Sequence, residues 1–387
     1  MLLYWMWFAM LQGITAGQKR TLLAHFSNPA IIYNTSDYTG VPGITPDTVL
    51  ALAEKNLDPT RTMLNSCRRK GVGIVALGEP GYPARLRAIA EPPMVLYYKG
   101  TLPDFTARPA IGVVGTRKAT PYGVAMAEHI SRQIAECGGL VVSGGAHGVD
   151  AAALKGALAA QVPSVTVLGC GVDIDYPAAN RPLFRKLEQC GCLLSEYPPG
   201  TKPAPWQFPA RNRIISGISN GVLVIEAPEK SGALITARDA MEQGRDVFVI
   251  PGNIDKETCI GSNGLLREGA TAVFSGWDVL AEYASEYSNA LRKVAEKPLP
   301  VVEEEPPADK KSVDIPAVTA YSGKENELSD LDETERMLLS CIGPAPRPID
   351  EVVKQAGLTA YAAMGVITKL SLKGLVMHHP GKRISAK

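Results

Sequence analysis

Arginines, glycines and small polar side chains gather in four segments of the sequence, each of which follows an apolar run. These segments contain the residues that we expect to contact a ligand: Gly115, Arg117, Lys118, Ser143, Gly144, Gly145, Arg211, Asn212, Arg213, Ser231 and Gly232. Guanidinium groups and the backbone N–H groups of glycine-rich turns are well suited to hold phosphate oxygens. The chemistry that these residue types predict is anion recognition.

The same segments lack the residue patterns that catalysis needs. They contain no pair of carboxylates in an acid/base arrangement and no nucleophile elbow, and His147 has no triad partner at a recognisable spacing. The seven cysteines include no pair with zinc-site spacing and fit buried residues in a reducing cytosol. We therefore expect a protein that is not an enzyme, with no metal and no cofactor.

An alternation of apolar runs and helical patterns between residues 74 and 283 must position these segments. The runs are apolar at consecutive positions, as in strands that helices cover on both faces. They span 110–115, 140–143, 164–169, 191–195, 221–226 and 246–251. This pattern predicts an α/β fold, a Rossmann-like, doubly wound and mostly parallel sheet whose ligand lies beyond the carboxyl ends of the strands.

Flanking regions differ from this core in composition. We predict an N-terminal helical domain over 1–70, the Rossmann-like core over 71–283, a flexible linker over 284–327 and a winged-helix domain over 328–387. In the first domain, Gly-Ile-Thr occurs before two helical patterns, with Thr15 and Thr45 as expected N-caps. Such turns contact DNA phosphates in some proteins and only pack helices together in others, and both interpretations stay open.

In the winged-helix domain, the third helix is expected over 360–373. Its cations are Lys369 and Lys373, both near its end, so it lacks the side chains that read base edges. This predicts weak duplex binding at most, and a contact with a protein or with the core domain instead.

The charge balance and the N-terminus limit the choice of partners. With 40 Lys and Arg against 39 Asp and Glu, the chain is not a polycation, so a nucleic-acid site must be a local basic patch. Residues 1–11 are strongly apolar but too short to cross a bilayer, and we interpret them as a core helix. The expected location is cytoplasmic, with no membrane partner.

Longer motifs in the core resemble the DNA-processing protein A (DprA/Smf) family. The most specific are Ser-Gly-Gly-Ala-His-Gly-Val-Asp at 143–150 and Phe-Pro-Ala-Arg-Asn-Arg-Ile-Ile-Ser-Gly at 208–217. Shorter matches occur in the same order along the chain, at 114–117, 168–173, 176–177, 194–200, 229–233 and 244–248. With its flanking domains, the resemblance covers nearly the whole chain.

The resemblance implies single-stranded DNA binding, loading of the RecA-type recombinase during natural transformation, and a homodimer. Carried over by motif, the DNA pocket would contain Arg117, residues 143–145 and residues 211–213. The self-association region would contain Ile260, Leu265 and Leu266. Some family members have a lysine just before the Phe-Pro-x-Arg-Asn-Arg run, where this chain has Trp206-Gln207, so that contact is not assigned.

Two other classes of function remain open at this point. A nucleoside-monophosphate phosphoribohydrolase shares a glycine-rich phosphate loop, but residues 229–237 lack the terminal acid of its motif. A protein-interaction scaffold with a vestigial pocket is the other alternative. In the loop at 196–209, Tyr197, Trp206 and Phe208 either stack on bases or simply pin the loop.

Overall fold

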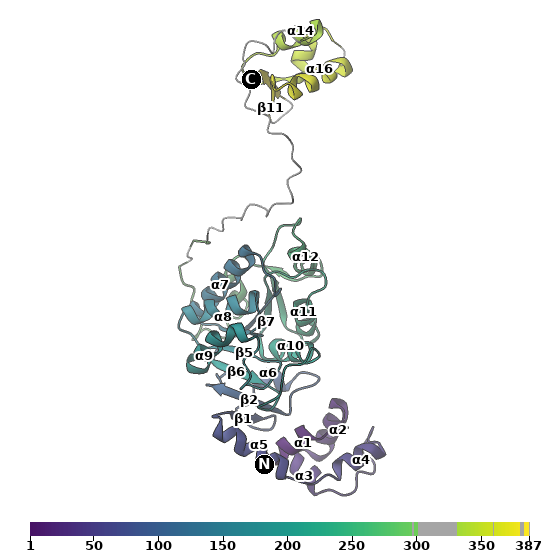
Figure 1. Ribbon diagram of the computed structural model, residues 1–387, viewed down its shortest axis with the longest axis vertical. Helices are drawn as coiled ribbons and strands as arrows, with labels where there is room; N and C mark the ends of the chain where they lie inside the picture. The colour runs from purple at the N-terminus through teal and green to yellow at the C-terminus, as the bar shows by residue number, and fades with distance from the viewer. Residues whose placement is uncertain (296–297, 301–330, 359, 380–382, 387) are drawn as a thin grey trace. The chain divides into compact units, whose positions relative to one another are not determined.

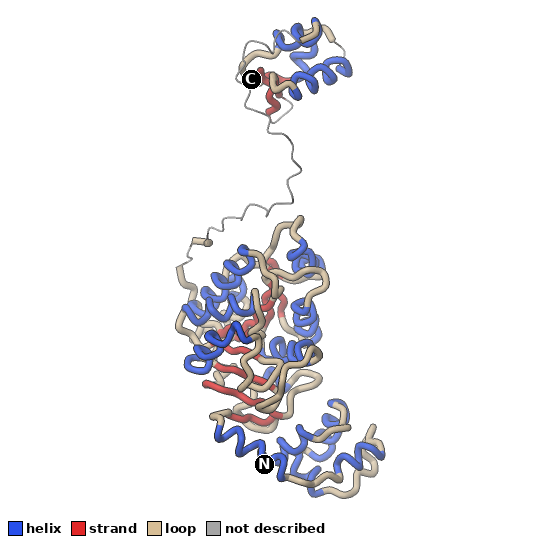
Figure 2. Tube along the Cα trace, in the orientation of Figure 1, coloured by secondary structure: helices blue, strands red, loops and turns tan. Residues whose placement is uncertain are grey.

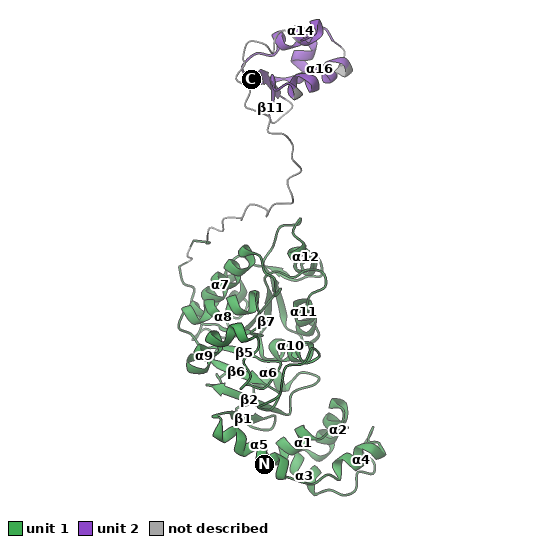
Figure 3. Cartoon of the chain, in the orientation of Figure 1, with its two compact units in different colours: residues 1–304 green, residues 305–387 purple. Residues whose placement is uncertain are grey.

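The computed structural model describes residues 1–295, 298–300, 331–358, 360–379 and 383–386. These residues form two compact units, divided between residues 304 and 305 (Figure 3). Most of the linker predicted over 284–327 lies outside the described residues. The first part of this segment, residues 284–295, is described. Tyr287 and Leu291 are buried against the core, so the packed chain extends beyond residue 283.

A nine-stranded sheet forms the centre of the first unit, in the order β1-β2-β6-β5-β4-β3-β7-β8-β9. Strands β3 to β9 pair in parallel, whereas β2 runs antiparallel to β6 and β1 antiparallel to β2. The strands are β1 (Gly73–Ala76), β2 (Val95–Gly100), β3 (Ala110–Val114), β4 (Leu140–Ser143), β5 (Ser164–Val167), β6 (Cys192–Ser195), β7 (Gly221–Val224), β8 (Asp246–Val249) and β9 (Thr271–Ala272). The predicted mostly parallel α/β sheet is confirmed, and each predicted apolar run forms one of its strands.

Helices cover both faces of the sheet (Figures 1 and 2). One face carries α7 (Pro121–Glu136), α8 (Val149–Ala159), α9 (Arg181–Cys190) and α13 (Gly276–Ala281). The other carries α6 (Ala84–Arg87), α10 (Gln207–Ile218), α11 (Gly232–Glu242) and α12 (Ile260–Arg267). Short 3₁₀ turns precede α9 and α12, at η1 (Ala178–Asn180) and η2 (Glu257–Cys259). Because both faces are covered, every residue of β3 to β7 is buried.

Five helices precede the sheet: α1 (Leu2–Met10), α2 (Ala16–Phe26), α3 (Pro29–Asn34), α4 (Pro46–Leu52) and α5 (Asp58–Arg69). Both predicted N-caps are present, since Thr15 Oγ1 accepts a hydrogen bond from the Gln18 N–H and Thr45 Oγ1 accepts one from the Thr48 N–H. Helix α1 is buried as predicted, and Trp5 packs with Tyr97 of β2. This contact ties the N-terminal helices to the edge of the sheet.

The second unit has three helices and a three-stranded sheet, in the order β10-β12-β11. Its elements are α14 (Glu333–Cys341), β10 (Arg347–Pro348), α15 (Ile349–Gln355), α16 (Ala360–Leu372), β11 (Val376–His379) and β12 (Arg383–Ala386). Helix α14 begins at a capping box, in which Asp332 Oδ1 accepts a hydrogen bond of 2.7 Å from the Glu335 N–H. This arrangement confirms the predicted winged helix.

The sheet reverses its winding direction between β3 and β7. Strands β4, β5 and β6 follow one another on one side of β3, and β7, β8 and β9 follow on its other side. In open parallel sheets a crevice forms at such a switch point, outside the carboxyl ends of the strands. The loops that follow β3 and β7 are therefore where the topology places a ligand.

Candidate functional site

A cleft of about 490 Å³ opens at this switch point. The predicted residues that line it are Gly115, Arg117, Arg211, Asn212, Ser231 and Gly232. Gly144 lines a smaller cavity, of about 60 Å³, together with Arg117 and Arg211. The topology thus brings residues from four connections between strands, far apart in the sequence, to one place.

One exposed cation of the cleft is Arg117, on the loop after β3. Its guanidinium carbon lies 5.4 Å from the centre of the Phe208 ring, within the range of a cation–π contact. The Phe208 ring lies 5.5 Å from the Tyr176 ring, with 32° between their planes, and both rings line the cleft. A cation above one of two adjacent aromatic rings offers donors to phosphate beside surfaces on which bases stack.

The buried carboxylate of Glu226 holds the Arg117 loop in place. One carboxylate oxygen accepts a 2.9 Å hydrogen bond from the Thr120 N–H, and the other accepts a 2.5 Å bond from the Thr120 hydroxyl. The Glu226 carbonyl accepts a 2.7 Å bond from the Thr116 N–H. Glu226 was not among the predicted residues, although an acid at the end of an apolar run is a signal visible in the sequence.

Glycine is required at the exit from β3. A Cβ atom on Gly115 would lie 2.5 Å from the Val149 side chain, closer than real contacts allow. A Cβ atom on Gly148, where φ is +72°, would lie 2.4 Å from the Thr116 carbonyl oxygen. The loops after β3 and β4 therefore pack closely, backbone against backbone. This packing fixes the position of the loop residues that line the cleft.

Arg211 lies beneath the cleft, with only 4% of its surface exposed. It donates a 2.5 Å hydrogen bond to the Gly144 carbonyl and another to the Val167 carbonyl. Burial raises the pKa of the neighbouring Asp150, and the positive charge of Arg211 opposes that shift. Arg211 therefore joins the ends of β4 and β5, whereas Arg117 is exposed to a ligand in the cleft.

The N-terminus of α11 forms the other wall. Ser231 caps it by accepting a 3.2 Å hydrogen bond from the Ala233 N–H, and the Asn212 side chain donates to the Gly232 carbonyl at 3.2 Å. Lys230 also lines this wall and was not among the predicted residues. A helix N-terminus beside a lysine adds positive potential to the cleft.

Other predicted residues lie elsewhere. Arg213 forms a 2.6 Å ion pair with Glu196 and lines a separate cleft, of about 480 Å³, against the N-terminal helices. Ser143 is buried and donates its hydroxyl to the Val113 carbonyl at 2.7 Å. Lys118 is exposed and Gly145 is buried, and neither lines the large cleft. Trp206 is exposed and packs edge to face on Tyr197, with 6.0 Å between ring centres.

The three residues predicted for self-association have different environments. Ile260 is 50% exposed, whereas Leu265 is 3% exposed and belongs to the core on the α10–α11 side of the sheet. Leu266 is half-buried against the same core. Leu265 is thus occupied within the chain, and Ile260 is the residue of the three that offers a free apolar surface.

In the described residues, no group of three or more His, Cys, Asp or Glu side chains could hold a metal ion. Within the same part of the chain, no helix combines the length and the apolarity that crossing a membrane requires.

Family models and known proteins match this chain over most of its length. Residues 73–284 match the family model of the DNA recombination-mediator protein A, and residues 323–382 match that of the DprA winged helix domain. Protein Smf of Synechocystis is 34% identical over 345 residues, which cover 85% of this chain and 83% of that protein. DNA processing protein DprA of Bacillus subtilis is 38% identical over 62% of this chain and 82% of its own length.

Solved structures agree with the sequence matches. The X-ray structure of DprA from Streptococcus pneumoniae superposes with a TM-score of 0.64 at 34% identity, over 72% of this chain and 97% of that one. A DprA structure from Helicobacter pylori, described for its single-stranded DNA binding mode, superposes with a TM-score of 0.51 at 30% identity, over 56% and 97% of the chains. From the order of its strands, its winged helix and these matches, the chain belongs to the DNA-processing protein A (DprA/Smf) family.

Proposed function

We propose that this chain binds single-stranded DNA in the cleft between β3 and β7 and helps to load a RecA-type recombinase onto it during natural transformation. The observation that carries the proposal is the cleft itself. Among the described residues that line it, Arg117, Arg211 and Lys230 are cations and buried Asp150 is the single acid. The Phe208 and Tyr176 rings lie beside Arg117.

This arrangement favours a single strand over the alternatives. Stacking on Phe208 or Tyr176 requires an unpaired base, which a duplex does not offer. Hydrolysis of a nucleotide would need a carboxylate or a nucleophile at the ligand, and Asp150 is buried beside Arg211. The role in recombinase loading is supported by the name of the matching family model, a recombination mediator.

The proposal is tested by fluorescence anisotropy with a labelled oligothymidine and with a duplex of equal length. We expect the single strand to bind more tightly. About three phosphate contacts in the cleft should give a slope of log K against log salt near −2, at roughly −0.7 per contact. Recombinase filaments should form faster on the bound strand. Equal affinity for both forms, or no binding to either, would contradict the function.

We also infer that the chain forms a homodimer through the region around Ile260. Exposed apolar side chains occur beyond the carboxyl ends of the neighbouring strands β8 and β9: Ile254, Ile260 and Phe274. A patch of this kind pairs with its own copy about a twofold axis. The interface residues of the partner would then be the same as those of this chain.

Ile260→Glu should shift the chain from dimer to monomer, because a charge would be buried in the interface. Light scattering at tens of micromolar should report twice the chain mass of 41.2 kDa for the unmodified protein and the single mass for the variant. Ile31→Glu is the control, since Ile31 is also an exposed isoleucine but lies in α3. A monomeric mass for the unmodified protein would rule out the dimer at this concentration.

A further inference from the structure

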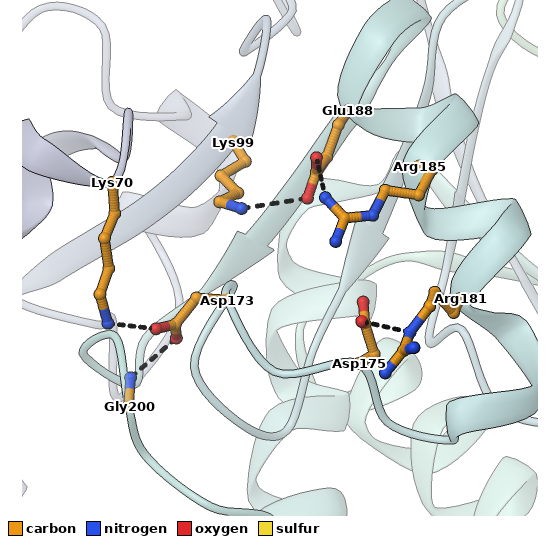
Figure 4. A network of polar contacts seen from close by, with 8 residues as sticks. All are labelled: Lys70, Lys99, Asp173, Asp175, Arg181, Arg185, Glu188 and Gly200. Carbon is orange, nitrogen blue, oxygen red and sulfur yellow. Dashed lines mark hydrogen bonds and ion pairs between the residues drawn. The ribbon is translucent and has the colours of Figure 1, made fainter.

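A second group of cations lies outside the cleft, along α9 and at the C-terminal end of α5. We call it the α9 band, and it consists of Arg68, Arg69, Lys70, Arg181, Arg185 and Lys186. All six residues are exposed. Lys99, at the end of β2, lies between its two parts (Figure 4). The cleft and its proposed function do not use any of these residues.

Three carboxylates form ion pairs with cations of the band and with Lys99 (Figure 4). Asp173 joins Lys70 at 2.5 Å and also accepts a 2.7 Å hydrogen bond from the Gly200 N–H. Asp175 pairs with Arg181 at 2.8 Å. These contacts connect the end of α5 with the loop after β5 and with the start of α9.

One further carboxylate, that of Glu188, lies between Lys99 at 3.1 Å and Arg185 at 3.4 Å. The band with Lys99 therefore has seven positive charges against three negative ones, a local excess of +4 on a chain whose net charge is +1. The guanidinium groups remain accessible to a ligand, because the side chains of Arg181 and Arg185 are 63% and 60% exposed.

The band is continuous with the cleft. Asp175, the partner of Arg181, directly precedes Tyr176, whose ring lines the cleft. Helix α9 begins at Arg181 and extends away from this point, with Arg185 and Lys186 one turn further on. A strand that stacks on Tyr176 would therefore meet Arg181 next.

We propose that single-stranded DNA leaves the cleft over Tyr176 and continues along the α9 band toward the C-terminal end of α5. This path rests on the proposed function of the cleft. Helix α9, with ten residues, is about 15 Å long and carries three of the band's cations. The chain would then hold a longer stretch of DNA than the cleft alone accommodates.

The composition of the band favours a phosphate backbone over a protein. Protein interfaces combine arginines with buried aromatic anchors near their centre. Among the described residues, none of the exposed large hydrophobic side chains lies on α9, β2 or α5. Arginine forks on a surface without apolar anchors match the phosphate oxygens of a flexible strand.

The test compares two labelled oligothymidines, one of about 6 nucleotides that fills the cleft and one of about 16 nucleotides that reaches the band. In the full-length chain, the substitutions Arg181→Gln, Arg185→Gln and Lys186→Gln should remove about three phosphate contacts. The salt slope for the long oligonucleotide should become less steep by about 2, and its affinity should approach that of the short one. Binding of the short oligonucleotide should not change.

Two further variants complete the design. Arg185→Gln with Lys186→Gln leaves the Asp175–Arg181 pair intact and should reduce the slope by about 1.4. The matched control for the triple variant is Arg132→Gln with Arg292→Gln and Lys293→Gln, which removes the same charge where residues 292–293 meet the end of α7, with no expected effect.

The two proposals fail in different ways. If the unmodified chain binds neither oligonucleotide, the proposed function of the cleft is wrong. If both oligonucleotides bind and the band variants leave the salt slope of the long one unchanged, the path along α9 is wrong and the band serves another partner, such as an acidic protein. Equal losses on both oligonucleotides in the double variant would also contradict the path, because the cations would then act at the cleft.

Discussion

Arg211→Met is expected to lower the free energy of unfolding by about 3–5 kcal/mol, the usual cost of removing one partner from a buried set of charges. The methionine side chain fills a similar volume but cannot donate to the carbonyls of Gly144 and Val167. It also removes the larger of the two positive charges that compensate the buried Asp150. Urea unfolding followed by circular dichroism measures the change.

The loss should depend on pH in a defined direction. Burial raises the pKa of Asp150, and without Arg211 the pKa should rise further. A carboxyl with a raised pKa in the folded state destabilises the fold above that pKa, and the penalty disappears as the pH falls toward the value in the unfolded chain. The variant should therefore recover part of its stability in mild acid.

A double variant separates the charge from the packing. Arg211→Met combined with Asp150→Asn should be more stable at neutral pH than Arg211→Met alone, because the buried carboxylate is gone. A change of less than about 1 kcal/mol in the single variant would contradict the structural role of Arg211, since ordinary surface substitutions remain within that range.

Arg117→Ala is expected to weaken single-stranded DNA binding by about 1–3 kcal/mol, the range for a hydrogen bond to a charged group. This corresponds to an increase in Kd of about 5- to 150-fold, since 1.4 kcal/mol is about tenfold. The free energy of unfolding should change little, because Arg117 is exposed and its guanidinium contacts the ring of Phe208. Anisotropy titration and urea unfolding of the same preparation measure both quantities.

Lys118→Ala is the matched comparison. Lys118 has the same charge on the neighbouring residue and is also exposed, but it does not line the cleft. We expect its loss to affect binding much less than that of Arg117. Equal effects would mean that the general positive charge of the loop binds DNA and that the position of Arg117 above Phe208 does not matter.

Much of this protein follows from its sequence because the signals are local. Consecutive apolar residues predict each of the central parallel strands, since a strand covered on both faces has no polar side. Thr15, Thr45 and Asp332 predict helix starts, because a cap and the N–H group that it accepts from lie three residues apart. The motifs that identify the family are likewise short and continuous.

Arg211 is buried beneath the cleft and Arg213 pairs with Glu196 outside it, and this difference depends on helix geometry and on their neighbours. Both were predicted for the pocket, but they lie two residues apart within α10, and such residues face different directions. Helical periodicity alone could have separated them. The sequence could not show which one would be buried, because that depends on Gly144 and Val167 on one side and on Glu196 on the other.

The tertiary structure alone decided the rest of the site. Phe208 in α10 and Tyr176 in the loop after β5 are more than thirty residues apart, and they meet because β5 and β6 are neighbours in the sheet. Leu265 is as apolar as Ile260, yet the core covers one and leaves the other exposed. Burial and contact between distant segments depend on how the strands are ordered, and a one-dimensional pattern of residue types does not contain that order.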